Sequence, residues 1–171
     1  MIAFVILHYR AADMTRKCVE RIKALEGDKK IVIVDNASPN GTGQELLDEY
    51  AEDSEIKVIL NPENSGFAKG NNMGVRWVQE NVPADFVVVL NNDVEILQKD
   101  FCPKVEAIYR RHSFDVLGPD IISVFSGIHQ NPKSLHGYSL ESVRKKREKV
   151  ARTKNPILLL LSSGEKNSPA I

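Results

Sequence analysis

The chain has 171 residues, of which 42% are hydrophobic and 27% charged, a composition typical of one soluble globular domain. Its 23 basic residues balance its 23 acidic residues, which argues against a dedicated nucleic-acid binder, because such proteins normally carry a basic surplus. No apolar run approaches the ~20 residues of a membrane span, and the chain opens on an apolar stretch without a basic leader, so we expect a cytoplasmic protein.

Apolar runs and helical spacings alternate along the first 120 residues. The predicted strands cover residues 2–9, 31–34, 56–60 and 85–90, with a short one at 115–117. Helices are predicted between them, with apolar faces formed by Met14, Cys18, Ile22 and Leu25; by Leu46, Leu47, Tyr50 and Ala51; by Gly70, Met73, Gly74 and Trp77; and by Phe101, Val105, Ile108 and Tyr109. The alternation predicts an α/β fold: a Rossmann-like, mostly parallel sheet with helices on both faces.

Small and sulfur-containing residues add three expectations to this outline. Gly27 is expected to end the first helix. Gly70 and Gly74 let their helix approach either the sheet or a ligand closely, and both interpretations are open. Cys18 and Cys102 lie at apolar helix positions without a zinc-type spacing, so we expect two buried, reduced thiols.

Ligands of open α/β sheets bind at the carboxyl ends of the strands. The loops expected there, residues 8–13, 35–41, 61–72 and 91–95, are rich in Asn, Asp, Ser and Gly. They contain neither the GxGxxG of dinucleotide-binding folds nor the GxxxxGK[ST] of P-loops. Two neighbouring strands instead end in acids, Asp35 and Asp93, whose carboxylates suit a nucleoside or a hard cation such as magnesium or manganese.

Four stretches in order carry a resemblance: a first strand ending in HY, then IVIVDNASPNG, NPENSGFAKGNNMG and FVVVLNNDVEI. Together they resemble family 2 glycosyltransferases of the GT-A fold, especially bacterial enzymes of surface-polysaccharide synthesis. The resemblance implies transfer of a sugar from a nucleotide diphosphate donor to a saccharide or lipid-linked acceptor, with inversion at the anomeric carbon. It covers residues 1–125, which we expect to form the donor-binding core, while 126–171 form a shortened acceptor-side region.

The same resemblance assigns roles to particular residues. Asp35 matches the acid that contacts the nucleobase or ribose, and Asp93 matches the last acid of the metal-binding DxD motif. The implied donor-binding set is Asp35, Asn36, Ser38, Gly66, Lys69, Asn71, Asn72 and Asn92. Because the DxD position reads Asn-Asn-Asp, we expect magnesium or manganese to bind more weakly than usual.

The general base of an inverting transferase has no clear match in this chain. Asp120, Glu141 and Glu165 are the acids considered, and none stands in a family-like cluster. His129 is either an ordinary histidine or a group facing the acceptor. Two other functions stay open: a truncated module that binds nucleotide sugar without transferring it, and, less favoured, a sugar nucleotidyltransferase.

The region after residue 132 is strongly basic, with eight basic and two acidic residues between Lys133 and Lys154. We expect a basic helix at 140–152 and a frayed tail after it. The helix is either a solvated face or a contact for phosphate or anionic lipid at the inner membrane face.

Overall fold

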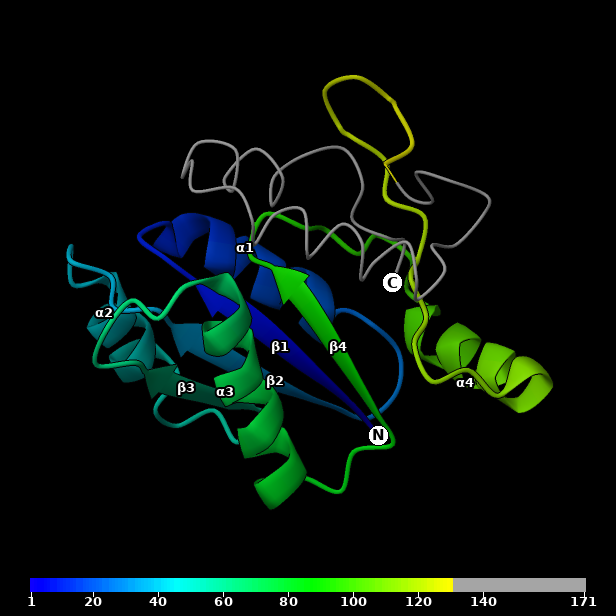
Figure 1. Ribbon diagram of the computed structural model, residues 1–171, viewed down its shortest axis with the longest axis horizontal. Coiled ribbons are helices and arrows are strands. Elements are labelled where there is room, and N and C mark those ends of the chain that lie inside the picture. The colour runs from blue at the N-terminus through cyan, green and yellow to red at the C-terminus, as the bar shows by residue number, and fades with distance from the viewer. Residues whose placement is uncertain (131–171) are drawn as a thin grey trace, which may run out of the picture. The chain divides into compact units, whose positions relative to one another are not determined.

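A computed structural model of the chain describes residues 1–130, which belong to two compact units, Met1–His112 and the residues from Ser113 onward. The first unit contains a four-stranded parallel sheet with strand order β3-β2-β1-β4 (Figure 1). Its strands are β1 (Ile2–His8), β2 (Lys29–Asp35), β3 (Ile56–Leu60) and β4 (Phe86–Asn91). The predicted α/β fold with a parallel sheet is confirmed.

Four helices connect and cover these strands. They are α1 (Ala12–Lys23), α2 (Thr42–Glu49), α3 (Phe67–Asn81) and α4 (Phe101–His112). Figure 1 shows α3 crossing one face of the sheet while α1 and α2 lie behind the other. Phe101 at the start of α4 packs against Phe4 of β1 with tilted rings, 6.2 Å between centroids, so α4 also packs against the sheet. The predicted coverage of both faces is therefore confirmed.

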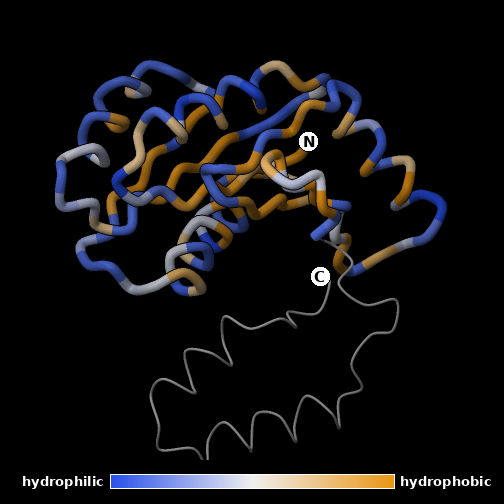
Figure 2. The backbone as a smooth tube through the Cα atoms, turned by 90° about the horizontal axis from the view of Figure 1, so that it is seen from above, coloured by the Kyte–Doolittle hydropathy of each residue, from blue (hydrophilic) through white to orange (hydrophobic). Residues whose placement is uncertain are grey.

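Side-chain alternation along the strands sends each apolar residue to one of these two layers. Ala3, Val5, Val32 and Val34 form one cluster with Val78 of α3. Phe4, Ile6, Ile31 and Ile33 point to the opposite layer, and all four are fully buried. Figure 2 shows these apolar strands running through the interior, with hydrophilic loops outside them. Burial of each of these valine, isoleucine and phenylalanine side chains stabilises the fold by about 1.5–3 kcal/mol.

The glycines of α3 serve helix–sheet packing. A Cβ atom on Gly70 would lie 2.6 Å from Leu7 Cδ1, and one on Gly74 would lie 2.5 Å from Val5 Cγ1. Both values are shorter than carbon contacts in packed interiors. The absence of side chains at these two positions lets α3 lie directly on β1 and β2.

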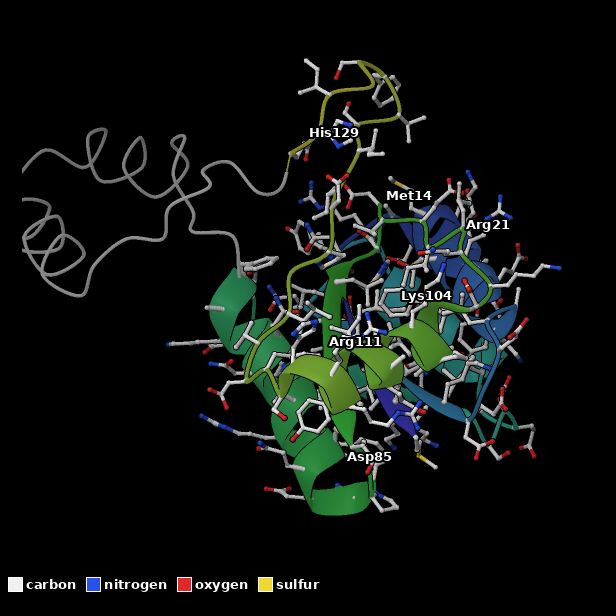
Figure 3. The ribbon with its side chains drawn as sticks, turned by 90° about the vertical axis from the view of Figure 1, so that its right-hand side faces the viewer. Met14, Arg21, Asp85, Lys104, Arg111 and His129 are labelled. Atoms are coloured by element: carbon white, nitrogen blue, oxygen red, sulfur yellow. The ribbon has the colours of Figure 1, made fainter. Side chains whose placement is uncertain are left out.

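Several local expectations were wrong. Ala51 follows the end of α2 at Glu49 and is exposed, and Ile108 and Tyr109 of α4 are 39% and 43% exposed. Met14, labelled in Figure 3, is 47% exposed, because the buried stripe of α1 runs through Thr15, Cys18, Val19 and Ile22 instead. The helix ends at Lys23, so buried Leu25 belongs to the following turn, and Gly27, with φ of 90°, comes after that turn. The cysteines meet the expectation, since Cys18 and Cys102 are both buried and free.

The second unit, as far as residue 130, is an irregular segment and a small loop. Among the described residues no strand pairs with the stretch 115–117, so no strand forms there. Ile122 instead pairs with His129 in an isolated antiparallel bridge. The loop between them exposes Val124 and Phe125 almost completely. In the part of the chain that the structure describes, no helix is long and apolar enough to cross a bilayer. The predicted basic helix and tail lie outside the described residues.

Candidate functional site

A row of polar residues crosses the carboxyl edge of the sheet. The register pairs His8 of β1 with Asp35 of β2 on one side, and Leu7 with Asn91 of β4 on the other. Asp35 ends β2, His8 ends β1 and Asn92 follows directly after β4, so the three residues lie side by side at this edge. Because β1 separates β2 from β4, the prediction that the strands ending in Asp35 and Asp93 are neighbours was wrong. The strand order reverses at β1, between β2 and β4, and such a switch point is where open α/β sheets bind ligands.

Asp35 is buried at the end of β2, with only 5% of its surface exposed. Its two carboxylate oxygens accept the Ser38 backbone N–H, each at 3.2 Å, and Oδ1 lies 3.9 Å from His8 Nε2. Gly43 of α2 provides the space, since a Cβ there would lie 2.2 Å from Asp35 Oδ2. The carboxylate thus holds together the turn between β2 and α2.

Asn36, the next residue, joins two of the edge loops. Its Oδ1 accepts hydrogen bonds from Asn61 Nδ2 at 3.1 Å and from the Ser65 N–H at 3.2 Å, while its Nδ2 donates to Asn64 Oδ1 at 2.9 Å. The residue is 4% exposed, and both polar side-chain atoms have protein partners. Asn36 therefore fixes the loop after β3 against the loop after β2.

Ser38 makes the corresponding connection toward β1. Its Oγ accepts the backbone N–H of Arg10 at 2.8 Å, and Arg10 has a positive φ of 67°. Arg10 and Thr42 line an open groove of about 460 Å³ between the first turns of α1 and α2. Asp35, Asn36 and Ser38 thus come together at the edge: Ser38 holds the loop beside this groove, whereas Asn36 holds the loop after β3.

Asn92 is held by α1. Its Nδ2 donates to Thr15 Oγ1 at 3.1 Å and lies 3.5 Å from the Ala11 carbonyl oxygen. Its Oδ1 has no hydrogen-bond partner among residues 1–130. Because the amide nitrogen is committed to α1, the amide oxygen is the atom left for a ligand.

Asp93 follows Asn92 and is exposed at the end of β4. Glu95, two residues further on, forms ion pairs with Lys17 at 2.5 Å and with Arg21 at 3.1 Å, both on α1. Its carboxylate is therefore not directed to a site shared with Asp93. Within the described residues, no group of three His, Cys, Asp or Glu side chains converges to hold a metal ion. Asp93 and the Asn92 oxygen suit a hard cation, but such an ion needs further oxygens from a ligand.

Near the start of α3, Asn71 carries a buried atom without a partner. Its Nδ2 donates to the Phe67 carbonyl oxygen at 3.1 Å, yet its Oδ1 has no partner among the residues described, and the side chain is only 6% exposed. An unpaired buried oxygen costs about 1–3 kcal/mol. Gly66, with φ of 82°, precedes the helix and donates its N–H to Asn64 Oδ1 at 3.1 Å.

Lys69 and Asn72 do not join the polar row. Both are exposed and line a groove of about 600 Å³ beside α3 and β3, together with Met73, Arg76 and Trp77. The helical rotation between Asn71 and Asn72 separates them, because consecutive residues of a helix do not share a face. The predicted donor set is therefore divided between the sheet edge and this groove.

The acids considered for a general base are only partly described. Asp120 Oδ2 lies 2.6 Å from His129 Nδ1, and His129, labelled in Figure 3, is 67% exposed in its side chain. Glu141 and Glu165 lie outside the described residues. Within the second unit, His129 thus forms an exposed pair with Asp120.

Sequence reasoning missed His8, Thr15 and Thr42 as site residues. His8 is fully buried, with Nδ1 2.8 Å from Thr15 Oγ1 and Nε2 3.0 Å from Thr42 Oγ1. Burial lowers the pKa of the His8 imidazole, although nearby Asp35 opposes the shift. Two features of the sequence could have identified them: a histidine at the end of an apolar strand, and a threonine within the apolar stripe of α1.

The parallel sheet with its reversal at β1 defines an α/β unit of the GT-A fold, which solved structures support. S. aureus TarS 1–349 in complex with UDP superposes with a TM-score of 0.62 at 19% identity, over 75% of this chain and 38% of that one. A mannosyltransferase of Pyrobaculum calidifontis, in complex with GDP-Man and Mn²⁺, gives 0.56 at 16% identity, over 73% and 36%.

The chain belongs to glycosyl transferase family 2, whose family model matches residues 3–163. A curated relative is the low-salt glycan biosynthesis hexosyltransferase Agl10 of Haloferax volcanii, which is 26% identical over 122 residues. That match covers 71% of this chain but only 37% of Agl10. The chain thus spans somewhat more than a third of the length of this relative.

Proposed function

We propose that the chain binds a nucleotide-diphosphate sugar at the carboxyl edge of its sheet and takes part in transferring the sugar to an acceptor. The supporting observation is the row of Asp35, His8 and Asn92 at the strand-order reversal, followed by exposed Asp93. The unpaired Oδ1 of Asn71 supports a ligand with a hydrogen-bond donor, such as a ribose or sugar hydroxyl. Family membership supplies the reaction class.

A divalent cation, magnesium or manganese, fits the proposal with Asp93 as its protein carboxylate and Asn92 as a neutral oxygen ligand. When bound, such an ion neutralises charge on the diphosphate. With one charged ligand from the protein, we expect the ion to bind mainly together with the nucleotide. A Mn²⁺-containing complex of the mannosyltransferase neighbour is consistent with divalent-cation use.

Replacing Asp93 with asparagine is expected to weaken the Mn²⁺-dependent binding of UDP or GDP by about tenfold or more, because the ion loses its charged protein ligand. Calorimetric titration of UDP, GDP and dTDP, each with and without Mn²⁺, measures this. Asp100→Asn is the matched control, since Asp100 is an exposed carboxylate paired with Lys104 at 3.0 Å. Equal Mn²⁺ dependence in the wild type and Asp93→Asn contradicts the assignment.

A module that binds nucleotide sugar without transferring it is the second candidate. No general base is identified among the described residues 1–130, so binding without transfer is tested alongside transfer. An assay that follows both donor hydrolysis and transfer to an added saccharide or lipid-linked acceptor separates the two. Nucleotide binding with no transfer to any acceptor favours the module.

We also propose a peripheral contact with anionic membrane at its inner face. Val124 is 91% exposed and Phe125 is fully exposed at the tip of their loop. The sequence that follows carries eight basic residues against two acidic ones between Lys133 and Lys154. An exposed apolar tip followed in the sequence by a cationic segment matches the chemistry of an anionic bilayer surface.

The wild type is expected to co-sediment with vesicles that contain anionic lipid at low salt, and to do so much less at high salt. Phe125→Ser is expected to reduce the bound fraction severalfold, because the tip loses its largest apolar group. Phosphatidylcholine vesicles are the control surface, and Ser126→Thr, at the next loop position, is the control variant. A bound fraction that changes neither with salt concentration nor with the charge of the lipid contradicts the proposal.

A further inference from the structure

A hydrogen-bonded chain of buried side chains runs beneath the polar edge, from α2 through β1 to α1. His8 is at its centre, with Nε2 3.0 Å from Thr42 Oγ1 and Nδ1 2.8 Å from Thr15 Oγ1. Thr15 is fully buried and lies in the first turns of α1, whereas Thr42 is the first residue of α2. The far end of the chain is Asn92, which reaches Thr15 at 3.1 Å.

Counting protons gives the direction of each bond. Thr15 Oγ1 donates its single proton to the Ala11 carbonyl oxygen at 3.2 Å, and it accepts the Asn92 amide. A hydroxyl has one proton and two lone pairs, so the contact with His8 requires a proton on His8 Nδ1. Thr15 thereby uses its full hydrogen-bonding capacity, and the Nδ1–H tautomer of His8 follows from these partners.

The charge of His8 fits this arrangement. Burial lowers the pKa of the imidazole; Asp35 on β2 and Glu45 on α2 oppose the shift, and Arg16 on α1 adds to it. With its proton on Nδ1, the neutral ring has Nε2 as an acceptor. Thr42 Oγ1 has one proton for two acceptors, His8 Nε2 at 3.0 Å and Asn40 Oδ1 at 2.8 Å. The Thr15 side of His8, which leads to Asn92, therefore has the defined hydrogen-bond direction.

We propose that His8 and Thr15 are positioning residues that hold Asn92, and with it Asp93, in place at the edge of the sheet. The role of that edge in holding a nucleotide and its cation rests on the proposed function. His8 and Thr15 act through Asn92, because both are fully buried. The pair fixes the Asn92 nitrogen on α1 and so turns the amide oxygen toward the ligand side.

The binding test uses two matched pairs of variants, titrated by calorimetry with UDP plus Mn²⁺ and with GDP plus Mn²⁺. Thr15→Val keeps the side-chain shape but removes the hydroxyl, and we expect a loss of affinity of about tenfold, as for other groups that orient ligands. Thr15→Ser restores the hydroxyl and is expected to restore binding. His8→Asn offers an amide nitrogen near the Nδ1 position and is expected to bind better than His8→Gln, whose amide reaches toward Thr42.

A measurement without ligand tests the positioning directly. The side-chain amide signals of Asn92, assigned through their loss in Asn92→Asp, are expected to shift and to exchange faster in Thr15→Val than in Thr15→Ser or the wild type. A variant that does not fold is recognised by circular dichroism, and the His8 pair then carries the same measurement.

The outcomes separate the two proposals. If the wild type binds no nucleotide but Thr15→Val changes the Asn92 signals, the proposed function fails and the positioning role stands. If Thr15→Val leaves the Asn92 signals unchanged, the positioning role is overturned, whatever the affinity for nucleotide. The positioning role is also overturned if all four variants lose stability equally and show equal nucleotide affinity within each pair, that is, His8→Asn equal to His8→Gln and Thr15→Val equal to Thr15→Ser.

Discussion

Replacing Gly43 with alanine is expected to lower the free energy of unfolding by about 2–4 kcal/mol, because the added methyl group collides with a buried carboxylate. The new Cβ would lie 2.2 Å from Asp35 Oδ2 and 2.3 Å from Asp35 Cγ. Gly43 is part of helix α2, where alanine would otherwise be favoured by about 1 kcal/mol. Urea unfolding followed by circular dichroism measures the loss.

A double-mutant cycle shows whether Asp35 is the cause. In an Asp35→Ala background the two shortest contacts disappear, and only the contact with Asp35 Cβ, at 2.9 Å, is left. The cost of Gly43→Ala is therefore expected to fall by more than half in that background. Gln44→Ala, at the exposed neighbouring position, is the control and is expected to change stability by less than about 0.5 kcal/mol. An unchanged cost would locate the strain elsewhere.

Replacing Gly74 with alanine is expected to destabilise the unit by about 1–2 kcal/mol, despite the helical preference of alanine. The added Cβ would lie 2.5 Å from Val5 Cγ1 and 2.9 Å from Val34 Cγ2. Both valines are fully buried, and a β-branched side chain has little rotamer freedom to move away. Helix α3 must therefore shift away from the sheet, and urea unfolding again measures the cost.

Gly70→Ala on the same helix is the matched comparison. Its Cβ would meet Leu7 Cδ1 at 2.6 Å, and that atom is the far end of a flexible, partly buried side chain. We expect a smaller cost than for Gly74→Ala, because Leu7 can change rotamer. Equal costs for the two variants would mean that the stiffness of the contacted side chain does not decide the effect.

Much of the fold could be predicted from the sequence because burial leaves a periodic pattern. The run Ile56–Leu60 coincides with β3, and Phe67 begins α3 as expected. The prediction failed at Met14, which is apolar but exposed, and at residues 115–117, which are largely apolar but do not pair as a strand. Hydrophobicity alone does not say which side of a short helix faces the sheet, or whether a partner strand exists.

The sequence by itself determined the alternating fold, the polar strand ends and the membership in glycosyl transferase family 2, because these depend on residue order along the chain. Tertiary structure alone decided which side chains meet. Asp35 and Asn36 are consecutive, yet their side chains make contacts at different loops, and His8, Thr15 and Asn92 meet across 84 positions of sequence. Strand register and helix rotation set such contacts, and neither is encoded in any one local stretch.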